Sequence, residues 1–156
     1  TRDIPIEHFA KMNNKNEATF VSLQRSSQSS ELNEIWPTQN KLGLQDKISK
    51  IADSDDPEDF LEYASIVANC NLVITTDTTV AHLAAGMGVP TWILLPKIPD
   101  WRWGLNGNTS FWYPSVRLFR QKVKGSWDEE MKEITKELEK FIKSTKAATL
   151  DSPPNA

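Results

Sequence analysis

The chain has 156 residues, enough for one domain with a buried core. Its 21 acidic residues outnumber 18 basic ones, and the net charge of −3 lacks the basic balance typical of nucleic-acid-binding proteins. One cysteine and two histidines exclude an internal disulfide and argue against a Cys/His metal site, so we expect a protein of a reducing compartment.

The first third of the chain predicts one short helix and two strands. Pro5 suits the first turn of a helix that runs through Met12. Residues 18–24 (ATFVSLQ) are apolar and β-branched enough for a buried strand, and residues 47–52 (KISKIA) predict a second, weaker strand. The Ser-rich residues 25–44 between them predict a loop.

A strong helix start follows at Asp56. Its side chain can cap the helix, Pro57 suits the first turn, and Glu58 and Asp59 lie near the positive end of the helix dipole. The helix is expected to run to Asn69. Its apolar stripe consists of Phe60, Tyr63, Ala64 and Val67.

Residues 53–56 (DSDD) also fit an Asp-x-Asp signature, whose carboxylates can hold a hard cation such as Mg²⁺ or Mn²⁺. Because these carboxylates immediately precede a helix that begins with proline, capping and solvation explain them better. No metal is predicted.

The middle of the chain predicts a strand, a helix and a strand, at residues 72–75, 78–87 and 91–95. Such a crossover requires parallel pairing. Gly86 and Gly88 are expected to end the helix in a turn with positive φ, and Pro90 prevents its continuation.

The last third predicts a strand at residues 116–119 and a helix opened by a capping box from Ser126 to Glu129. One face of this helix is apolar, with Trp127, Met131, Ile134, Leu138 and Phe141. The whole pattern predicts an α/β fold, a Rossmann-like three-layer sandwich with a mostly parallel sheet. The domain is expected over residues 1–145. A disordered tail is expected over residues 146–156, because the chain from Ser144 onward has too little apolar content to order itself.

The best candidate site is the stretch from Ile74 to His82 (ITTDTTVAH), where a strand of the predicted parallel sheet ends and a helix begins. Free N–H groups at the start of a helix bind anions, and Thr78 and Thr79 add hydroxyl donors, so a diphosphate is the expected ligand. The simpler interpretation is that Asp77 or Thr78 only caps the helix. His82 lies one turn further and either reaches the same ligand or fixes the turn by donating to a carbonyl.

Two other segments could contribute to this site. Residues 92–112 contain four of the six tryptophans, which could stack on a base or sugar but more simply form their own aromatic cluster. Arg102 could bind a phosphate oxygen or pair with Asp100. Gln24, at the end of the first predicted strand, could line the same edge of the sheet, although polar residues at strand ends are usually just solvated.

Four motifs in this region resemble the carboxyl-terminal half of two-domain GT-B glycosyltransferases of the tetratricopeptide-repeat-associated type, related to the ADP-heptose heptosyltransferases. They are Asp-Thr-x-x-x-His-Leu-Ala from Asp77, Gly-x-Pro-x-Trp from Gly88, Pro-Asp-Trp-Arg-Trp from Pro99, and Trp-Tyr-Pro-x-x-Arg-Leu-Phe-Arg-Gln from Trp112. The resemblance is strong over residues 59–121 and weaker over residues 2–24.

The resemblance implies that this half binds a nucleotide sugar without a metal or other cofactor. By position, Thr78 and Thr79 would hold the diphosphate and Asp77 would face the sugar. It also implies that the acceptor-binding domain, with the catalytic base, is absent from this chain, and that the first strand of the domain is missing. This chain alone would then bind the donor without catalysing transfer.

Two alternatives remain open at this stage. The chain could be a non-catalytic or degenerate module that binds a nucleotide or another anion. It could also be an interaction domain that uses the aromatic loop for docking and an exposed sheet edge for forming a homodimer.

We expect a cytoplasmic protein with no nucleic-acid partner and no membrane span, because no apolar run is long enough and the first residues do not resemble a secretory signal.

Overall fold

The structure is a computed structural model that describes residues 4–15, 18–23, 48 and 50–151. Its centre is a parallel three-stranded sheet in the order β1-β2-β3. The strands are β1 (Val73–Thr76), β2 (Thr91–Leu95) and β3 (Val116–Arg120). The α/β fold with a parallel sheet and its three C-terminal strands are thus confirmed, each to within a residue at either end.

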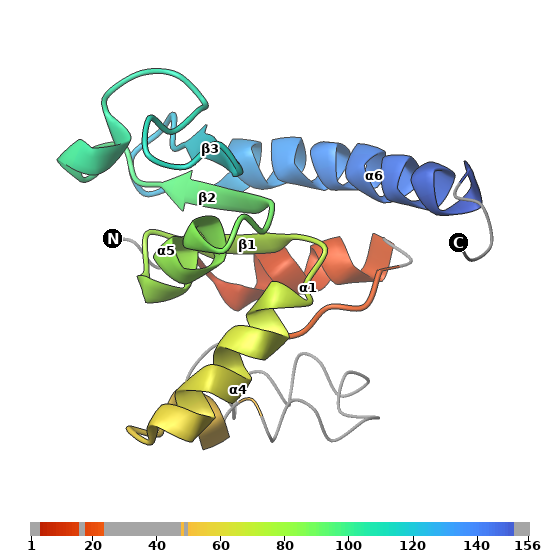
Figure 1. The fold of residues 1–156 in the computed structure, drawn as a ribbon. Helices are drawn as coiled ribbons and strands as arrows, with labels where there is room; N and C mark the ends of the chain where they lie inside the picture. Colours follow the sequence, from red (N-terminus) through yellow and green to blue (C-terminus); the bar gives the residue numbers. More distant parts are fainter. Residues whose placement is uncertain (1–3, 16–17, 24–47, 49, 152–156) are drawn as a thin grey trace.

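Helices surround this sheet (Figure 1). They are α1 (Ile6–Lys15), α4 (Pro57–Ala68), α5 (Thr79–Gly86), the short 3-10 helix η3 (Trp101–Trp103) and α6 (Asp128–Asp151). None of the described helices combines the length and apolar content that crossing a membrane requires.

The two faces of β2 contact different helices because successive side chains of a strand point to opposite faces. Trp92 and Leu94 pack with one buried cluster that includes α6 and Met12 of α1. Ile93 and Leu95 pack on the other face with Ala81 and Ala85 of α5, among other residues. Every residue of β2 is buried, as expected for a central parallel strand covered on both sides.

The start of α4 confirms the capping interpretation of the acidic run. The Asp56 carboxylate accepts a hydrogen bond of 2.9 Å from the backbone N–H of Glu58, and Pro57 is the first helical residue. Tyr63 and Val67 are buried as expected, whereas Phe60 is exposed. The predicted apolar stripe was therefore wrong at its first position.

Residues 18–23 form no strand, contrary to the prediction. Their side chains nevertheless alternate, since Phe20 packs against the cluster beneath α6, and Val21 and Leu23 pack against the cluster beneath α4. The carbonyl of Leu23 accepts a hydrogen bond of 2.8 Å from the Tyr63 hydroxyl. Side chains here contact two clusters in alternation without a strand ladder. The sequence pattern alone could not distinguish this extended segment from a strand. Gln24 and the predicted loop over residues 25–44 lie outside the described residues.

The predicted strand over residues 47–52 was also wrong. Ile48 and residues 50–52 are helical. Ile48 and Ile51 are three residues apart and both buried, in the cluster that contains Val67 of α4. The spacing of the two isoleucines fits one face of a helical turn better than alternation along a strand.

The apolar face predicted for the last helix is confirmed in α6, where Trp127, Met131, Ile134 and Leu138 are buried and Phe141 packs against them. The predicted capping box is not formed. Instead, the Ser126 hydroxyl lies 3.4 Å from the Asp128 carboxylate, and buried Glu130 accepts a hydrogen bond from the N–H of Lys122. The helix continues to Asp151, past the predicted start of the tail.

The turn after α5 needs one left-handed residue. Gly88 has φ of 76°, as predicted, and leads into β2. Gly86 is instead the last helical residue, so only Gly88 adopts the predicted positive φ.

Candidate functional site

The candidate site lies at the start of α5, where β1 ends. Because β1, β2 and β3 are parallel, the residues that follow them emerge at the same edge of the sheet. Thr78 is the N-cap residue, with extended backbone (φ −138°, ψ 172°), but no side chain caps this helix. Within the described residues, the backbone N–H groups of Thr79 and Val80 donate no hydrogen bond. The helix thus presents free donors at its positive end.

The threonine hydroxyls of this turn bind each other and the chain behind them. The hydroxyl oxygens of Thr75 and Thr78 lie 3.1 Å apart, and both contact the carbonyl oxygen of Thr76, at 3.1 and 3.3 Å respectively. Thr79 is exposed beside them. The Thr78 hydroxyl therefore stabilises the turn, and the donors left for a ligand are the backbone N–H groups and the Thr79 hydroxyl.

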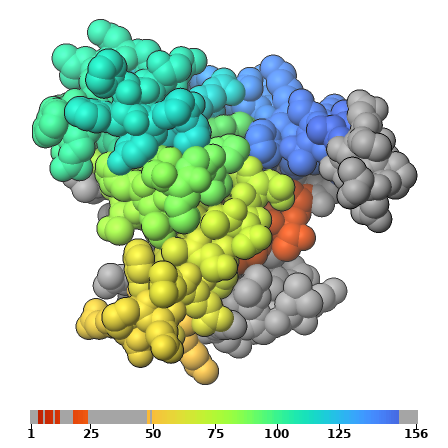
Figure 2. All heavy atoms as spheres, viewed as in Figure 1, coloured from red at the N-terminus to blue at the C-terminus, as the bar shows by residue number. Residues whose placement is uncertain are grey.

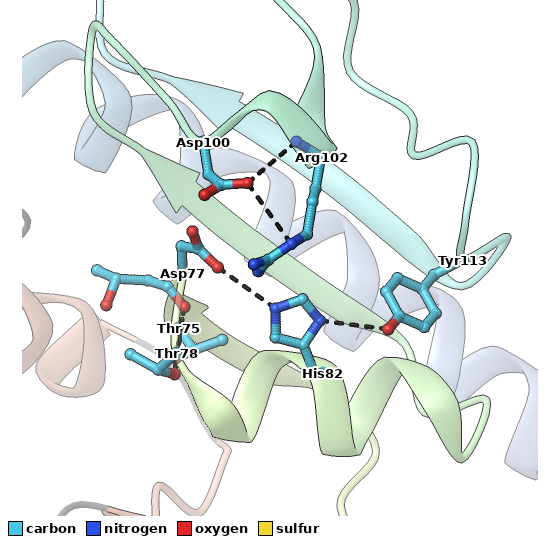
Figure 3. Close-up of polar contacts among 8 residues, drawn as sticks. Thr75, Asp77, Thr78, His82, Asp100, Arg102 and Tyr113 are labelled. Atoms are coloured by element: carbon cyan, nitrogen blue, oxygen red, sulfur yellow. Dashed lines mark hydrogen bonds and ion pairs between the residues drawn. The ribbon is translucent and has the colours of Figure 1, made fainter.

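Asp77 and His82 are brought together, as Figure 3 shows. Asp77 Oδ1 lies 3.5 Å from His82 Nε2, and the Asp77 side chain is only 9% exposed. On the other side of the ring, His82 Nδ1 lies 3.2 Å from the hydroxyl of Tyr113. The arrangement that satisfies all three groups has Nε2–H facing the carboxylate and the Tyr113 hydroxyl donating to Nδ1. Among the described residues, the ring nitrogens of His82 therefore face Asp77 and Tyr113, and the predicted donation to a carbonyl is not formed.

These contacts exclude the simpler of the two interpretations of Asp77, in which it only caps the helix. The sequence left open whether Asp77 or Thr78 simply caps α5, and in the structure neither side chain does so. Asp77 is instead directed to His82. The helix N-terminus is consequently not occupied by the protein's own carboxylate.

Aromatic rings hold His82 in place. Its ring stacks on Trp103, with centroids 5.4 Å apart and an angle of 25° between the planes, and meets Tyr113 edge-on at 5.9 Å. Trp103 is buried, and its indole N–H has no hydrogen-bond partner within the described residues. The four tryptophans of residues 92–112 therefore divide: Trp92 and Trp103 are packed inside, whereas Trp101 and Trp112 are exposed.

Arg102 pairs with Asp100, as one of the two predicted alternatives had it. Its Nε lies 3.6 Å from Asp100 Oδ1, and the same carboxylate oxygen accepts from the Arg102 backbone N–H at 3.1 Å. In Figure 3 the Arg102 side chain extends toward Asp77 and His82. Because half of the side chain is exposed, its guanidinium remains accessible to an anion at the start of α5.

A single arginine organises the loop that carries these residues. The guanidinium of Arg120 donates to the carbonyl oxygens of Trp103, Gly104, Asn106 and Gly107, at distances of 2.6 to 3.2 Å. Burial lowers the pKa of Arg120, because the charged group loses hydration. We refer to residues 97–113, which this arginine braces, as the aromatic lobe.

The sequence identified most of the polar groups here but missed Tyr113. The contact between His82 and Tyr113 spans 31 residues. No local sequence pattern predicts a contact between residues so far apart in the chain. Gln24 cannot be placed, because it lies outside the described residues.

Within the described ranges, no three His, Cys, Asp or Glu side chains gather as a metal site would require.

The chain matched no family model, no curated protein and no solved structure.

Proposed function

We propose that this chain binds the diphosphate of a nucleotide sugar at the N-terminus of α5, as the donor-binding half of a metal-independent GT-B glycosyltransferase. The observation that carries the proposal is the uncapped start of α5 at the carboxyl edge of a parallel sheet. Ligands of open α/β sheets bind at that edge, and a helix N-terminus favours phosphate. The four sequence motifs that resemble this enzyme class lie on α5, β2, η3 and β3 and in the turns beside them.

The charges around the turn fit a diphosphate better than a neutral ligand. The nearest carboxylate, Asp77, is close to His82, and Asp100 is paired with Arg102. Arg102 offsets the charge of Asp100, and the contact with His82 keeps the Asp77 carboxylate off the N–H groups at the start of α5, which limits its repulsion of an incoming anion. Arg102, whose side chain is half exposed, adds a positive charge to the fixed dipole of α5.

In a complete enzyme, this geometry would act on the leaving group. Negative charge develops on the diphosphate as the bond to the sugar breaks, and oriented N–H groups with the dipole of α5 would stabilise that charge without a metal ion. A base outside this chain would deprotonate the acceptor hydroxyl. The chain alone would bind donor without transferring sugar.

The second candidate is a module that binds a nucleotide or another anion without catalysis. It is favoured by the same uncapped helix, since the described site contains donors for an anion. Joining the chain to an acceptor-binding domain and assaying sugar transfer separates the two. Both candidates require that the start of α5 binds phosphate groups.

Calorimetric titration with UDP, GDP and ADP tests that shared requirement. We expect at least one of them to bind, and the matching nucleoside without phosphates to bind at least about tenfold more weakly, because charge-assisted bonds to the diphosphate are lost. Addition of EDTA should leave the affinity unchanged. Failure of all three nucleotides to bind to a sample that circular dichroism shows to be folded would contradict the proposal.

A further inference from the structure

The aromatic lobe exposes an unusual amount of apolar surface. Phe111 is 94% exposed and Trp101 76%, and Figure 2 shows residues 97–113 as a rounded projection at one end of the molecule. The exposed apolar side chains of the lobe are Ile98, Trp101, Leu105, Phe111 and Trp112, and Val123 in the turn of residues 122–125 adds another. Large exposed apolar surfaces on a soluble protein usually mark an interaction site.

This exposure is built into the fold rather than being a property of a loose loop. The four carbonyl groups bound by Arg120 fix the backbone of residues 103–107, and Thr109 forms a bridge with Arg117 in β3. Leu105 lies inside the braced segment and still points to solvent, with its side chain exposed. The chain thus holds apolar groups away from its own core.

The charge of this region is opposite to that of the whole chain. Residues 96–125 contain six basic residues and one acidic residue, whereas the complete sequence has a net charge of −3. The acidic residue, Asp100, is paired with Arg102, and Glu129 at the start of α6 is paired with Lys122. Lys97 joins the lobe to the turn, since its Nζ donates to the carbonyl of Lys122. In the sequence, Lys97 therefore precedes the exposed Ile98, and Lys122 and Lys124 flank the exposed Val123.

We propose that the aromatic lobe, with the turn of residues 122–125, docks the protein on the surface of an anionic lipid bilayer. Exposed aromatic and aliphatic side chains insert at the boundary between headgroups and acyl chains, and neighbouring lysines are attracted to anionic headgroups. The aliphatic members Ile98, Leu105 and Val123 favour a bilayer over single-stranded nucleic acid, whose bases stack on aromatic rings. This proposal is independent of nucleotide binding.

Sedimentation with vesicles tests it on the full chain. We expect binding to vesicles of equal parts phosphatidylcholine and phosphatidylglycerol, and at least about tenfold weaker binding to pure phosphatidylcholine. The double variant W101S/F111S should lose at least about tenfold in partitioning to the anionic vesicles. F60S/L61S is its matched control, because these two α4 side chains are also exposed, at 53% and 67%, but lie outside the lobe.

A second pair of variants tests the charge component. K122E/K124E should reduce binding to anionic vesicles by about tenfold or more. K132E/K136E, on the exposed side of α6, changes the net charge equally and should retain binding. All four variants are first compared with the parent protein by circular dichroism, and quenching of tryptophan fluorescence by brominated lipid reports insertion directly.

Three results would overturn the proposal. The first is that the parent protein stays in the supernatant with anionic vesicles. The second is that W101S/F111S binds them as well as F60S/L61S does. The third is that the lobe variants abolish a concentration-dependent dimer seen by light scattering, with no effect on lipid, which would assign the surface to a second copy of the chain.

Discussion

Thr78 stands at the N-cap position of α5 but gives the helix no side-chain cap. A threonine or aspartate cap contributes about 1 kcal/mol to helix stability on average. The chain has both residue types at this turn, yet the Thr78 hydroxyl contacts Thr75 and the Asp77 carboxylate faces His82. Residues that could cap the helix are thus held elsewhere, which leaves the N–H groups of Thr79 and Val80 free for a ligand.

Replacing Thr79 by proline removes one of these donors with little expected disturbance. Proline is favoured at the first helical position, and Thr78 already has the extended conformation that precedes proline (φ −138°, ψ 172°). Thr79→Pro should therefore fold normally and bind diphosphate more weakly than Thr79→Ala by about 1 kcal/mol, roughly fivefold. Calorimetry on both variants measures the difference.

The alanine variant is the matched control because it loses the hydroxyl but keeps the N–H. Equal affinities of the proline and alanine variants, with both proteins folded, would show that this N–H does not contact the diphosphate. The site would then have to be sought away from the first turn of α5.

At the scale of single residues, the sequence predicted which residues lie at the site better than it predicted the contacts that they make. Asp77, Thr78 and His82 follow from a strand that ends where a helix begins, which is a local pattern. Their actual contacts depend on Tyr113 and Trp103, which come from the loop after the next strand. Such pairings arise from tertiary packing, so periodicity and capping rules could not supply them.

Among the elements, those with strong local signals were predicted well. Asp56 followed by Pro57 marked the start of α4, and the apolar face that begins at Trp127 marked α6. The errors fall on residues 18–23 and on Ile48 with residues 50–52, in short apolar runs that suit a strand, a helix or an extended segment equally. Packing against α4, through Tyr63 and Val67, decides their conformation.

α6 is fixed to the sheet by an ion pair as well as by its apolar face. Arg117 in β3 donates to the Glu137 carboxylate at 2.8 Å, and this hydrogen bond is the main reason that the pKa of Glu137 lies below its ordinary value. A lowered pKa in the folded state means that the ionised form stabilises the fold. This stabilisation is complete well above pH 4.5, the ordinary pKa, and is lost as pH falls through the lower pKa of the folded state.

Glu137→Gln should therefore reduce stability at pH 7 by less than about 1 kcal/mol, because the pair is partly solvated. The difference from the parent protein should shrink on acidification below pH 4.5. Urea denaturation across this range measures it. Glu133→Gln is the control, since Glu133 is exposed on the same helix and pairs with no basic group among the described residues; a constant difference for Glu137→Gln at all pH values would contradict the assignment.

For the whole molecule, parallel pairing is the feature that creates the site. It places the start of α5, the aromatic lobe and the turn after β3 at one edge of the sheet. The sequence predicted this edge because a strand, helix and strand in succession require a parallel crossover. It did not predict that the lobe would keep Trp101 and Phe111 exposed, because Arg120 shapes the lobe from a distant strand.

The central claim is that the first turn of α5 receives a diphosphate, and amide chemical shifts in a titration with the tightest-binding nucleotide test it most directly. The amide signals of Thr79 and Val80 should show the largest shifts in the molecule, followed by those of Asp77 and His82. Saturable binding that leaves these amides unmoved, with the largest shifts on α4 or α6, would contradict the account.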